Sequence, residues 1–273
     1  MASPAVDGTA FVKFTNASTG SASLTTTGTG RAVYAVVVWG GNFTQGATTY
    51  GATSVASISS PNTTSWKKVA SGNANGTGVP TSPSTGATCY VEVWQGLAAA
   101  ALTAESITVT MSGSVNNNVD SGLMAVWGVS SAVAYSGPSN DTNASIPAVA
   151  VSYDSHAVAP GPNAFETATI STNSPADLLI SLGCNINNAV GQGIPAGFTT
   201  LVTQSNSAGN FWATLTSGYE QVSVAQTNAA ITASNTIGTT EGWVFIVLAI
   251  SNGPGNLPAP PPTFSLMSNT NVH

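Results

Sequence analysis

The carboxylates are the residues of this chain with the most potential for catalysis, because paired Asp or Glu side chains hydrolyse glycosidic bonds. Ten are present, and Glu92 is the best candidate, since alternation along a predicted strand puts it on one face with Tyr90 and Trp94. No second carboxylate has the required spacing, and nothing in the sequence places Glu220, in a related later segment, nearby. We therefore expect no enzymatic activity and a solvated Glu92, kept only as a weak ligand-binding candidate.

Nucleophilic and metal chemistry lack their usual sequence patterns. His156 follows Asp154 and Ser155, but a Ser-His-Asp triad is assembled from separate segments, and the chain has no G-x-S-x-G elbow. Cys89 and Cys184 lie in apolar runs, so we expect both thiols to be buried and free rather than paired. Spacings such as CxxC or HxxxH are absent, which predicts no metal site. No cofactor is expected.

The six tryptophans are the residues best suited to a sugar-binding platform. Trp39, Trp127 and Trp243 stand inside apolar runs and are predicted to be core residues. Trp94 and Trp212 have more polar neighbours in the sequence. These two are therefore kept as weak ligand-binding candidates.

Two long loops with almost no charge are further candidates for recognition. Residues 71–87 and 112–120 are rich in Gly, Ser, Thr and Asn, and Asn75, Asn116 and Asn117 supply amides that both donate and accept hydrogen bonds. Many weak hydrogen bonds of this kind, summed over several copies, suit contact with glycans or neighbouring subunits. The alternative is that both segments only connect strands.

Charge is scarce, and this excludes several classes of partner. Only 5% of the residues are charged, against about 25% in ordinary globular proteins, and the net charge is −6. Lys13, Arg31, Lys67 and Lys68 are the only cations, too few to bind nucleic acid or an anionic membrane. No apolar run reaches the roughly 18 residues of a membrane-spanning helix. The N-terminal residues lack the basic and apolar regions of a secretory signal, which favours a protein released by cell lysis.

The elements that position these residues are predicted to be β-strands, because runs of β-branched and aromatic residues alternate with Gly, Pro, Asn and Ser. The predicted strands cover residues 10–14, 22–26, 32–39, 55–59, 66–71, 88–95, 106–111, 122–129, 165–170, 177–182, 198–203, 211–216, 219–224, 230–233 and 242–250. Only segment 97–105 leaves helix and strand open. Residues 32–39 and 242–250 are continuously apolar and should be buried on both faces, whereas 88–95 and 106–111 alternate and should turn one face to water or a partner. The fold class is therefore all-β, a two-sheet antiparallel sandwich.

The chain also contains an internal repeat. The segments AVYAVVV, SWKKVAS, YVEVWQGL, SITVTMSG and SGLMAVWGVSS occur in the same order as ADLLISL, GFTTLVTQS, FWATLTSGYEQVSV, AITASN and EGWVFIVLAIS. Residues 122–130 align with residues 242–250 without a gap. A duplicated unit whose halves bury a shared core explains this order.

The repeat sets the expected domain organisation. One β-sandwich domain should cover residues 21–252, with halves at about 21–131 and 165–251 and a turn-rich crossing between them. Residues 1–20 are expected to form an N-terminal arm available for assembly contacts. Residues 253–273 form a proline-rich C-terminal tail.

Several of these pieces resemble a family of virion-associated and bacterial surface proteins with a jelly-roll-like β-sandwich. The segments that carry the resemblance are AVYAVVVWGG, SWKKVAS, CYVEVWQGLAAAALTAESITVTMSG, GLMAVWGVSS, ADLLISLG and AGFTTLVTQ. The resemblance implies a structural protein of a bacteriophage virion, a head decoration or fibre subunit, assembled in the host cytoplasm. Its partners would be other capsid or tail proteins and copies of itself in a homo-oligomer, with a host-surface glycan as a further candidate. The alternative is a glycan-binding adhesin, tail-borne or secreted.

Overall fold

The computed structural model describes residues 3–28, 31–41, 43–45, 48–75, 88–113, 116–131, 148–155, 165–172, 176–186, 193–208, 212–234 and 242–250. Within these ranges the regular structure is entirely β, and the paired strands are antiparallel. In the ambiguous segment 97–105, one strand ends at Ala98 and the next begins at Glu105, with an irregular, bent connection between them. The prediction of an all-β antiparallel sandwich is confirmed.

Four sheets contain the long strands, and we number them I to IV by layer. Sheet I is β2 (Thr19–Leu24), β9 (Glu105–Gly113) and β6 (Ala52–Ser59). Sheet II is β1 (Ala5–Ala17), β10 (Val119–Ser130), β3 (Arg31–Gly41), β8 (Thr88–Ala98) and β7 (Thr63–Asn75). Sheet III is β11 (Ala148–Ser155), β17 (Gly242–Ile250), β13 (Leu178–Ile186), β15 (Ala213–Gln221) and β14 (Thr199–Asn206). Sheet IV is β12 (Phe165–Ile170) and β16 (Ala229–Ser234), and β4 (Phe43–Gln45) with β5 (Thr48–Tyr50) forms a short hairpin.

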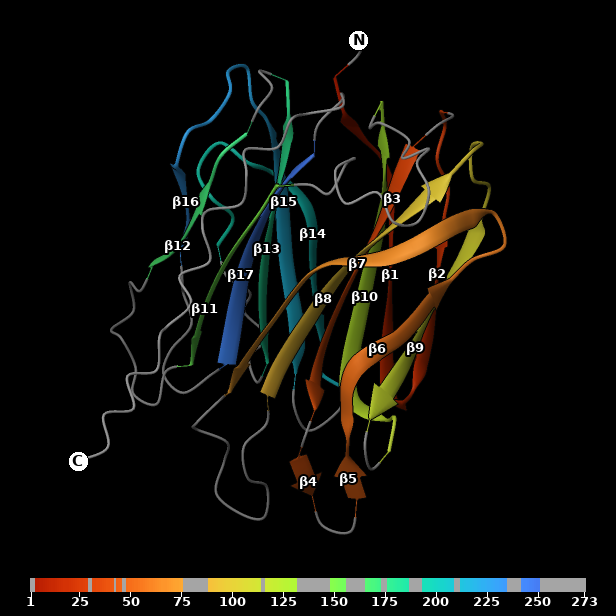
Figure 1. Cartoon of the computed structure of the whole chain (residues 1–273). Helices are drawn as coiled ribbons and strands as arrows, with labels where there is room; N and C mark the ends of the chain where they lie inside the picture. Colours follow the sequence, from red (N-terminus) through yellow and green to blue (C-terminus); the bar gives the residue numbers. More distant parts are fainter. Residues whose placement is uncertain are drawn as a thin grey trace, which may run out of the picture.

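The sheets stack face to face in the order I, II, III, IV (Figure 1). A central core joins the five-stranded sheets II and III, with Val36 and Ile246 among its buried residues. One outer core lies between sheets I and II around Ile107, and another between sheets III and IV around Ala168. The structure therefore adds an outer layer to each of the two sheets that the sequence predicted.

This layering explains the two strand patterns. The predicted strands at 32–39 and 242–250 belong to β3 and β17, which are interior strands of sheets II and III, and both of their faces are buried by neighbouring sheets. The alternating strand β9 lies in outer sheet I, where Ile107 and Val109 face the core and Ser106 is exposed. Segment 88–95 also alternates, but it belongs to β8 of the inner sheet II, where residues on both faces are buried, so the open face expected there was wrong. Burial on one face or two follows from the layer that each strand occupies.

Sheets II and III have the same strand order. Sheet II is ordered β1-β10-β3-β8-β7 and sheet III β11-β17-β13-β15-β14, so the strands correspond one to one along the chain. Contacts between the sheets are reciprocal: β1 lies against β14 and β11 against β7, while β10 contacts β14 and β15 and β17 contacts β7 and β8. Reciprocal contacts of this kind define a two-fold arrangement. The two halves of the chain therefore pack as a pseudo-symmetric pair.

The turns of the two halves repeat the same hydrogen bonds. In the first half, the backbone N–H of Thr26 donates to Leu102 O at 2.9 Å, and the N–H of Leu102 donates to Thr26 Oγ1 at 2.9 Å. In the second half, Thr172 and Gln226 repeat these two bonds at 2.9 and 2.8 Å. The matched contacts support a duplication, which stays a prediction about the origin of the chain, as does the jelly-roll-like topology.

The register between the halves differs from the gap-free alignment by one residue. That alignment matches Leu123 to Trp243, but Leu123 lies in the central core and Trp243 in the outer core of sheets III and IV. Val244 lies in the central core instead, so the structural match is between residues 122–129 and residues 243–250. These are also the residues of β10 that pair with β3 and the residues of β17 that pair with β13. A shift of one residue moves a strand side chain to the opposite face. The gap-free alignment was therefore wrong.

Several elements differ from the predicted strands. Strands β4, β5 and β11 lie in segments expected to be loops, and the expected N-terminal arm includes β1, an edge strand of sheet II. Segments 211–216 and 219–224 were predicted as two strands, but β15 runs continuously through Gly218. A Cβ atom on Gly218 would stand 2.7 Å from Ile194 Cγ2. This glycine therefore serves close packing rather than a turn.

Asn206 connects sheets II and III directly. Its side chain is 2% exposed on β14, and its Nδ2 donates to Phe14 O at 3.0 Å, to Gly122 O at 2.9 Å and to Thr15 Oγ1 at 3.2 Å. The equivalent residue of β7 is Ala74, also buried, so only one side of the pseudo-symmetric pair has this amide.

We expect Asn206→Ala to lower the free energy of unfolding by about 1–2 kcal/mol, because the buried hydrogen bonds between the sheets are lost. Urea denaturation measures this change. Asn206→Asp should cost more, since a carboxylate there would face two carbonyl oxygens. The exposed Asn73→Ala is the control and should leave stability unchanged. Equal stability of Asn206→Ala and the wild type would contradict the role of this amide.

We also expect the halves to stay together after the chain is cut between them. A protease site inserted between residues 132 and 147 leaves intact every strand that the structure describes. Because the central core joins sheets II and III, the two fragments should co-elute in size-exclusion chromatography and separate only in denaturant. Separation in native buffer would contradict this prediction.

Candidate functional site

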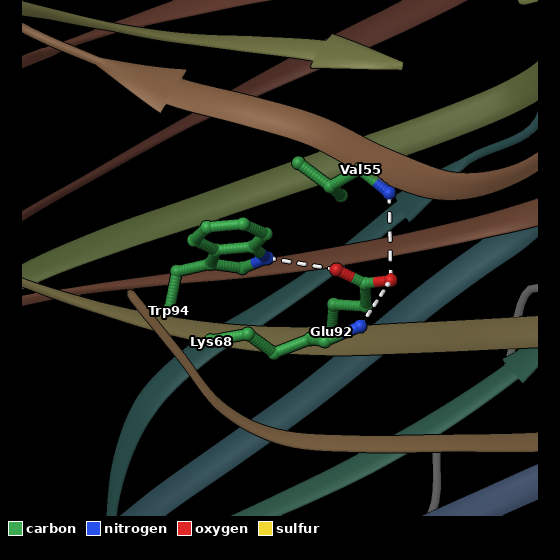
Figure 2. A network of polar contacts seen from close by, with 4 residues as sticks. All are labelled: Val55, Lys68, Glu92 and Trp94. Atoms are coloured by element: carbon green, nitrogen blue, oxygen red, sulfur yellow. Dashed lines mark hydrogen bonds and ion pairs between the residues drawn. The ribbon is translucent and has the colours of Figure 1, made fainter. Parts of the chain in front are cut away.

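The side chain of Glu92 is buried between sheets I and II. Glu92 lies on β8 between Val37 of β3 and Ser71 of β7, and it is 4% exposed. Strand β6 passes over this face of the sheet (Figure 2). The expectation of a solvated glutamate on an open face is therefore wrong, because strand alternation does not reveal the outer sheet that covers the face.

Three donors hold the Glu92 carboxylate. Oε1 accepts from Lys68 Nζ at 3.2 Å and from the backbone N–H of Val55 at 3.4 Å, and Oε2 accepts from Trp94 Nε1 at 2.9 Å (Figure 2). The Lys68 side chain is 44% exposed, so it forms the solvent-facing rim of the group. The network joins β6, β7 and β8, which fixes sheet I onto sheet II.

This arrangement suits a structural carboxylate better than a catalytic one. A general acid or base needs a proton or lone pair directed at a substrate, and hydrolysis of a glycoside needs a second carboxylate across a groove. Both oxygens of Glu92 are already engaged by the protein. Glu220, the residue in the related segment, lies on β15 in sheet III, away from this network.

Other described carboxylates also form hydrogen bonds with groups of the protein itself. Asp7 accepts from the backbone N–H groups of Thr27 and Gly28 at 3.0 and 3.2 Å. A hydrogen bond joins Asp120 to Tyr50. The pKa of Tyr50 is raised, chiefly by burial and further by the negative charge of Asp120 and by this hydrogen bond. These side chains anchor loops and strands.

Glu105 is a third anchor. It accepts from the Asn62 backbone N–H at 2.6 Å, from Asn62 Nδ2 at 2.7 Å and from the Ser60 hydroxyl. Burial by itself would raise the pKa of Glu105, but these hydrogen bonds outweigh it and lower the pKa. The residue thus stays ionised and holds the turn between β6 and β7.

Strand pairing and hydrogen bonds place four of the weak binding candidates at the end of the sandwich that has the β4–β5 hairpin. Figure 1 shows this hairpin at one end of the strands. Asn75 pairs with Thr88 at the last row of sheet II. Asn116 and Asn117 lie in the β9–β10 connection, and Asn116 Oδ1 accepts from the N–H of Gly51, just after β5, at 3.0 Å. Trp212 precedes β15 at the same end. The sequence could not bring these segments together, because they are distant in the chain.

The amide oxygens at this end organise the loop itself. Asn116 Oδ1 also accepts from Asn118 N at 3.0 Å, and Asn117 Oδ1 accepts from Gly113 N at 2.9 Å. Asn117 is exposed. Trp94 and Glu92 lie midway along β8 instead, so the six candidates do not form one site.

The outer face of sheet I is a surface of hydroxyl groups. Its cross-strand rows are Thr19–Thr110–Ser57 and Ser21–Thr108–Ser59. These side chains are exposed or partly exposed, and the residues between them face the core. The strands that carry these hydroxyls are about 4.8 Å apart, and successive residues on one face of a strand are about 6.7 Å apart. The face carries no charged side chain in these rows.

Sheet IV repeats this surface on the opposite side of the molecule. Ser21 Oγ and Thr108 Oγ1 are 2.8 Å apart in sheet I, and Thr167 Oγ1 and Thr232 Oγ1 are 2.8 Å apart in sheet IV. Thr169 is also exposed beside them. Alternation in the sequence predicted that one face of β9 is exposed. The rows of hydroxyl groups across neighbouring strands follow only from the register in which those strands pair.

The two cysteines are free and buried, as expected from the sequence. Both belong to the central core, and burial raises the pKa of each thiol. His156, which was considered as a member of a catalytic triad, lies outside the described residues. In the described part of the chain, no group of His, Cys, Asp and Glu is arranged to hold a metal ion.

Within the described residues, no helix is long and apolar enough to cross a membrane. No family model matches the chain, and neither the curated proteins nor the solved structures contain a match.

Proposed function

We propose that this protein is a non-enzymatic structural subunit on the surface of a bacteriophage particle, either a head decoration or a fibre subunit. It contacts other virion proteins and copies of itself. The observation that carries the proposal is the stack of four sheets, which presents uncharged hydroxyl faces on both outer sides. The resemblance of segments 30–251 to virion-associated sandwich proteins supports the particle surface as its location.

The use of the polar groups supports the structural role. The carboxylates of Asp7, Glu92 and Glu105 each hold a strand or turn in place. A rigid body with a single central core and few charges suits a passive surface component.

Immunogold electron microscopy of purified particles tests this proposal, with an antibody against the chain and particles lacking its gene as the control. Label on heads would support decoration, and label on the tail would support a fibre subunit. Particles without label, at an antibody titre that detects the purified protein, would overturn the proposal.

The alternative is a glycan-binding adhesin, which the hydroxyl faces and the loop end favour. Hydroxyls and amides exchange hydrogen bonds with sugars at little net gain, so binding would depend on many copies. A glycan array probed with multivalent protein tests this function. Binding that is lost in Asn117→Ala or Thr108→Asp, but kept in Trp94→Ala, would place the site on these surfaces. An array without hits would exclude the adhesin.

A further inference from the structure

Strand β1 is an open edge of sheet II. It has thirteen residues and pairs with β10 on one side, and no described strand pairs with its other side. An edge strand presents unpaired backbone N–H and C=O groups, which form a template for a strand from another chain. The edge is therefore a surface for β-sheet extension.

Phe11 stands in the middle of this edge and is 47% exposed. Its neighbours Ala10 and Val12 face the outer core between sheets I and II, so Phe11 faces the side of sheet III. There the nearest strand, β14, holds β1 at Thr15 through Asn206. The phenyl ring thus lies at the rim of the sandwich, with one side open to solvent.

The edge is irregular only near its two ends, at Gly8 and at Asn16, which has a φ of 49°. The register with β10 shifts between Asp7 and Thr9, where Gly8 has a φ of 81°. From Thr9 to Thr15 the pairing with β10 is unbroken. Bulges and charges are the usual protection of edge strands, and this segment has only Lys13.

We propose that β1 pairs antiparallel with β1 of a second copy of this chain, about a two-fold axis at Phe11. The two phenyl rings then lie directly opposite each other on one face, where aromatic cross-strand pairs are stabilising. Lys13 of each copy lies opposite the uncharged Thr9, whereas an axis at Lys13 would oppose two ammonium groups. Sheet II becomes one continuous sheet through both copies.

This inference gives a surface to the self-association proposed above, and it does not depend on attachment to a particle. Light scattering coupled to size-exclusion chromatography of the full chain tests it over a range of concentrations. The wild type should reach the mass of a dimer, and Phe11→Asp should remain a monomer at every concentration. Val224→Asp is the matched control, because Val224 is an exposed apolar residue, at 62%, in the turn after β15. It should dimerise as the wild type does.

Cross-linking tests the register. With oxidised glutathione as the oxidant, the introduced thiols of two F11C chains would each lose one proton and one electron to form an intermolecular disulfide, and the glutathione disulfide would be reduced to two glutathione thiols. Native Cys89 and Cys184 are buried and should not react. Mixing T9C with K13C should give the mixed dimer, and V224C should give none. A wild-type monomer at all concentrations, a dimer unaffected by Phe11→Asp, or F11C without covalent dimer would overturn the pairing. Immunogold label on particles is independent of each of these results.

Discussion

Trp127→Ala should lower the free energy of unfolding by about 3–5 kcal/mol, the usual range for truncation of a large buried aromatic side chain. Trp127 is fully buried in the central core, and its ring stacks on Tyr34 with centroids 6.0 Å apart. The cavity would lie between sheets II and III, where both five-stranded sheets are held rigidly by their own hydrogen bonds and cannot easily collapse. Denaturation followed by far-UV circular dichroism measures the loss.

Trp127→Phe is the matched control. It keeps an aromatic ring against Tyr34 and removes an indole Nε1 that has no hydrogen-bond partner in the described structure. Loss of volume and removal of an unsatisfied donor then act in opposite directions, so we expect a cost of at most about 1.5 kcal/mol. A Phe variant as unstable as the Ala variant would show that the indole contributes something other than volume and stacking.

The second large effect is expected from Glu92→Ala, at about 2–3 kcal/mol. Removal of the carboxylate leaves Trp94 Nε1 and the backbone N–H of Val55 without their acceptor beneath sheet I, and buried donors without acceptors are costly. Chemical denaturation of the variant measures this loss. If Glu92 serves only structure, the variant that still folds should keep every binding activity of the wild type.

Lys68→Ala is the control for the charge of this network. The ammonium group is partly exposed and screened by water, so we expect its loss to cost less than about 1 kcal/mol. The stability of the wild type should also change little with added salt. Equal destabilisation by Lys68→Ala and Glu92→Ala would show that the ion pair, rather than the two neutral donors, stabilises the contact between the sheets.

The sequence by itself determined the fold class. Apolar runs such as residues 242–250 are too long and too uniform for a half-exposed strand, and they predicted elements buried on both faces. The order of strand segments also predicted two similar halves, and the structure gives those halves the same strand order. The periodicity of apolar residues and the order of strand segments are properties of the chain itself, so both can be predicted from the sequence alone.

Only the tertiary structure decided which faces remain open. Glu92 was assigned to a solvated face by alternation, yet β6 from sheet I covers it, because alternation distinguishes two faces but not what packs on each. The match of Leu123 to Trp243, which is wrong by one residue, has the same cause. Both faces of these strands are apolar, so the sequence pattern does not show which residues share a face. The connection through Asn206 and the hydroxyl rows of sheets I and IV depend on register between distant segments. Contacts of that kind arise from packing, and no sequence window contains them.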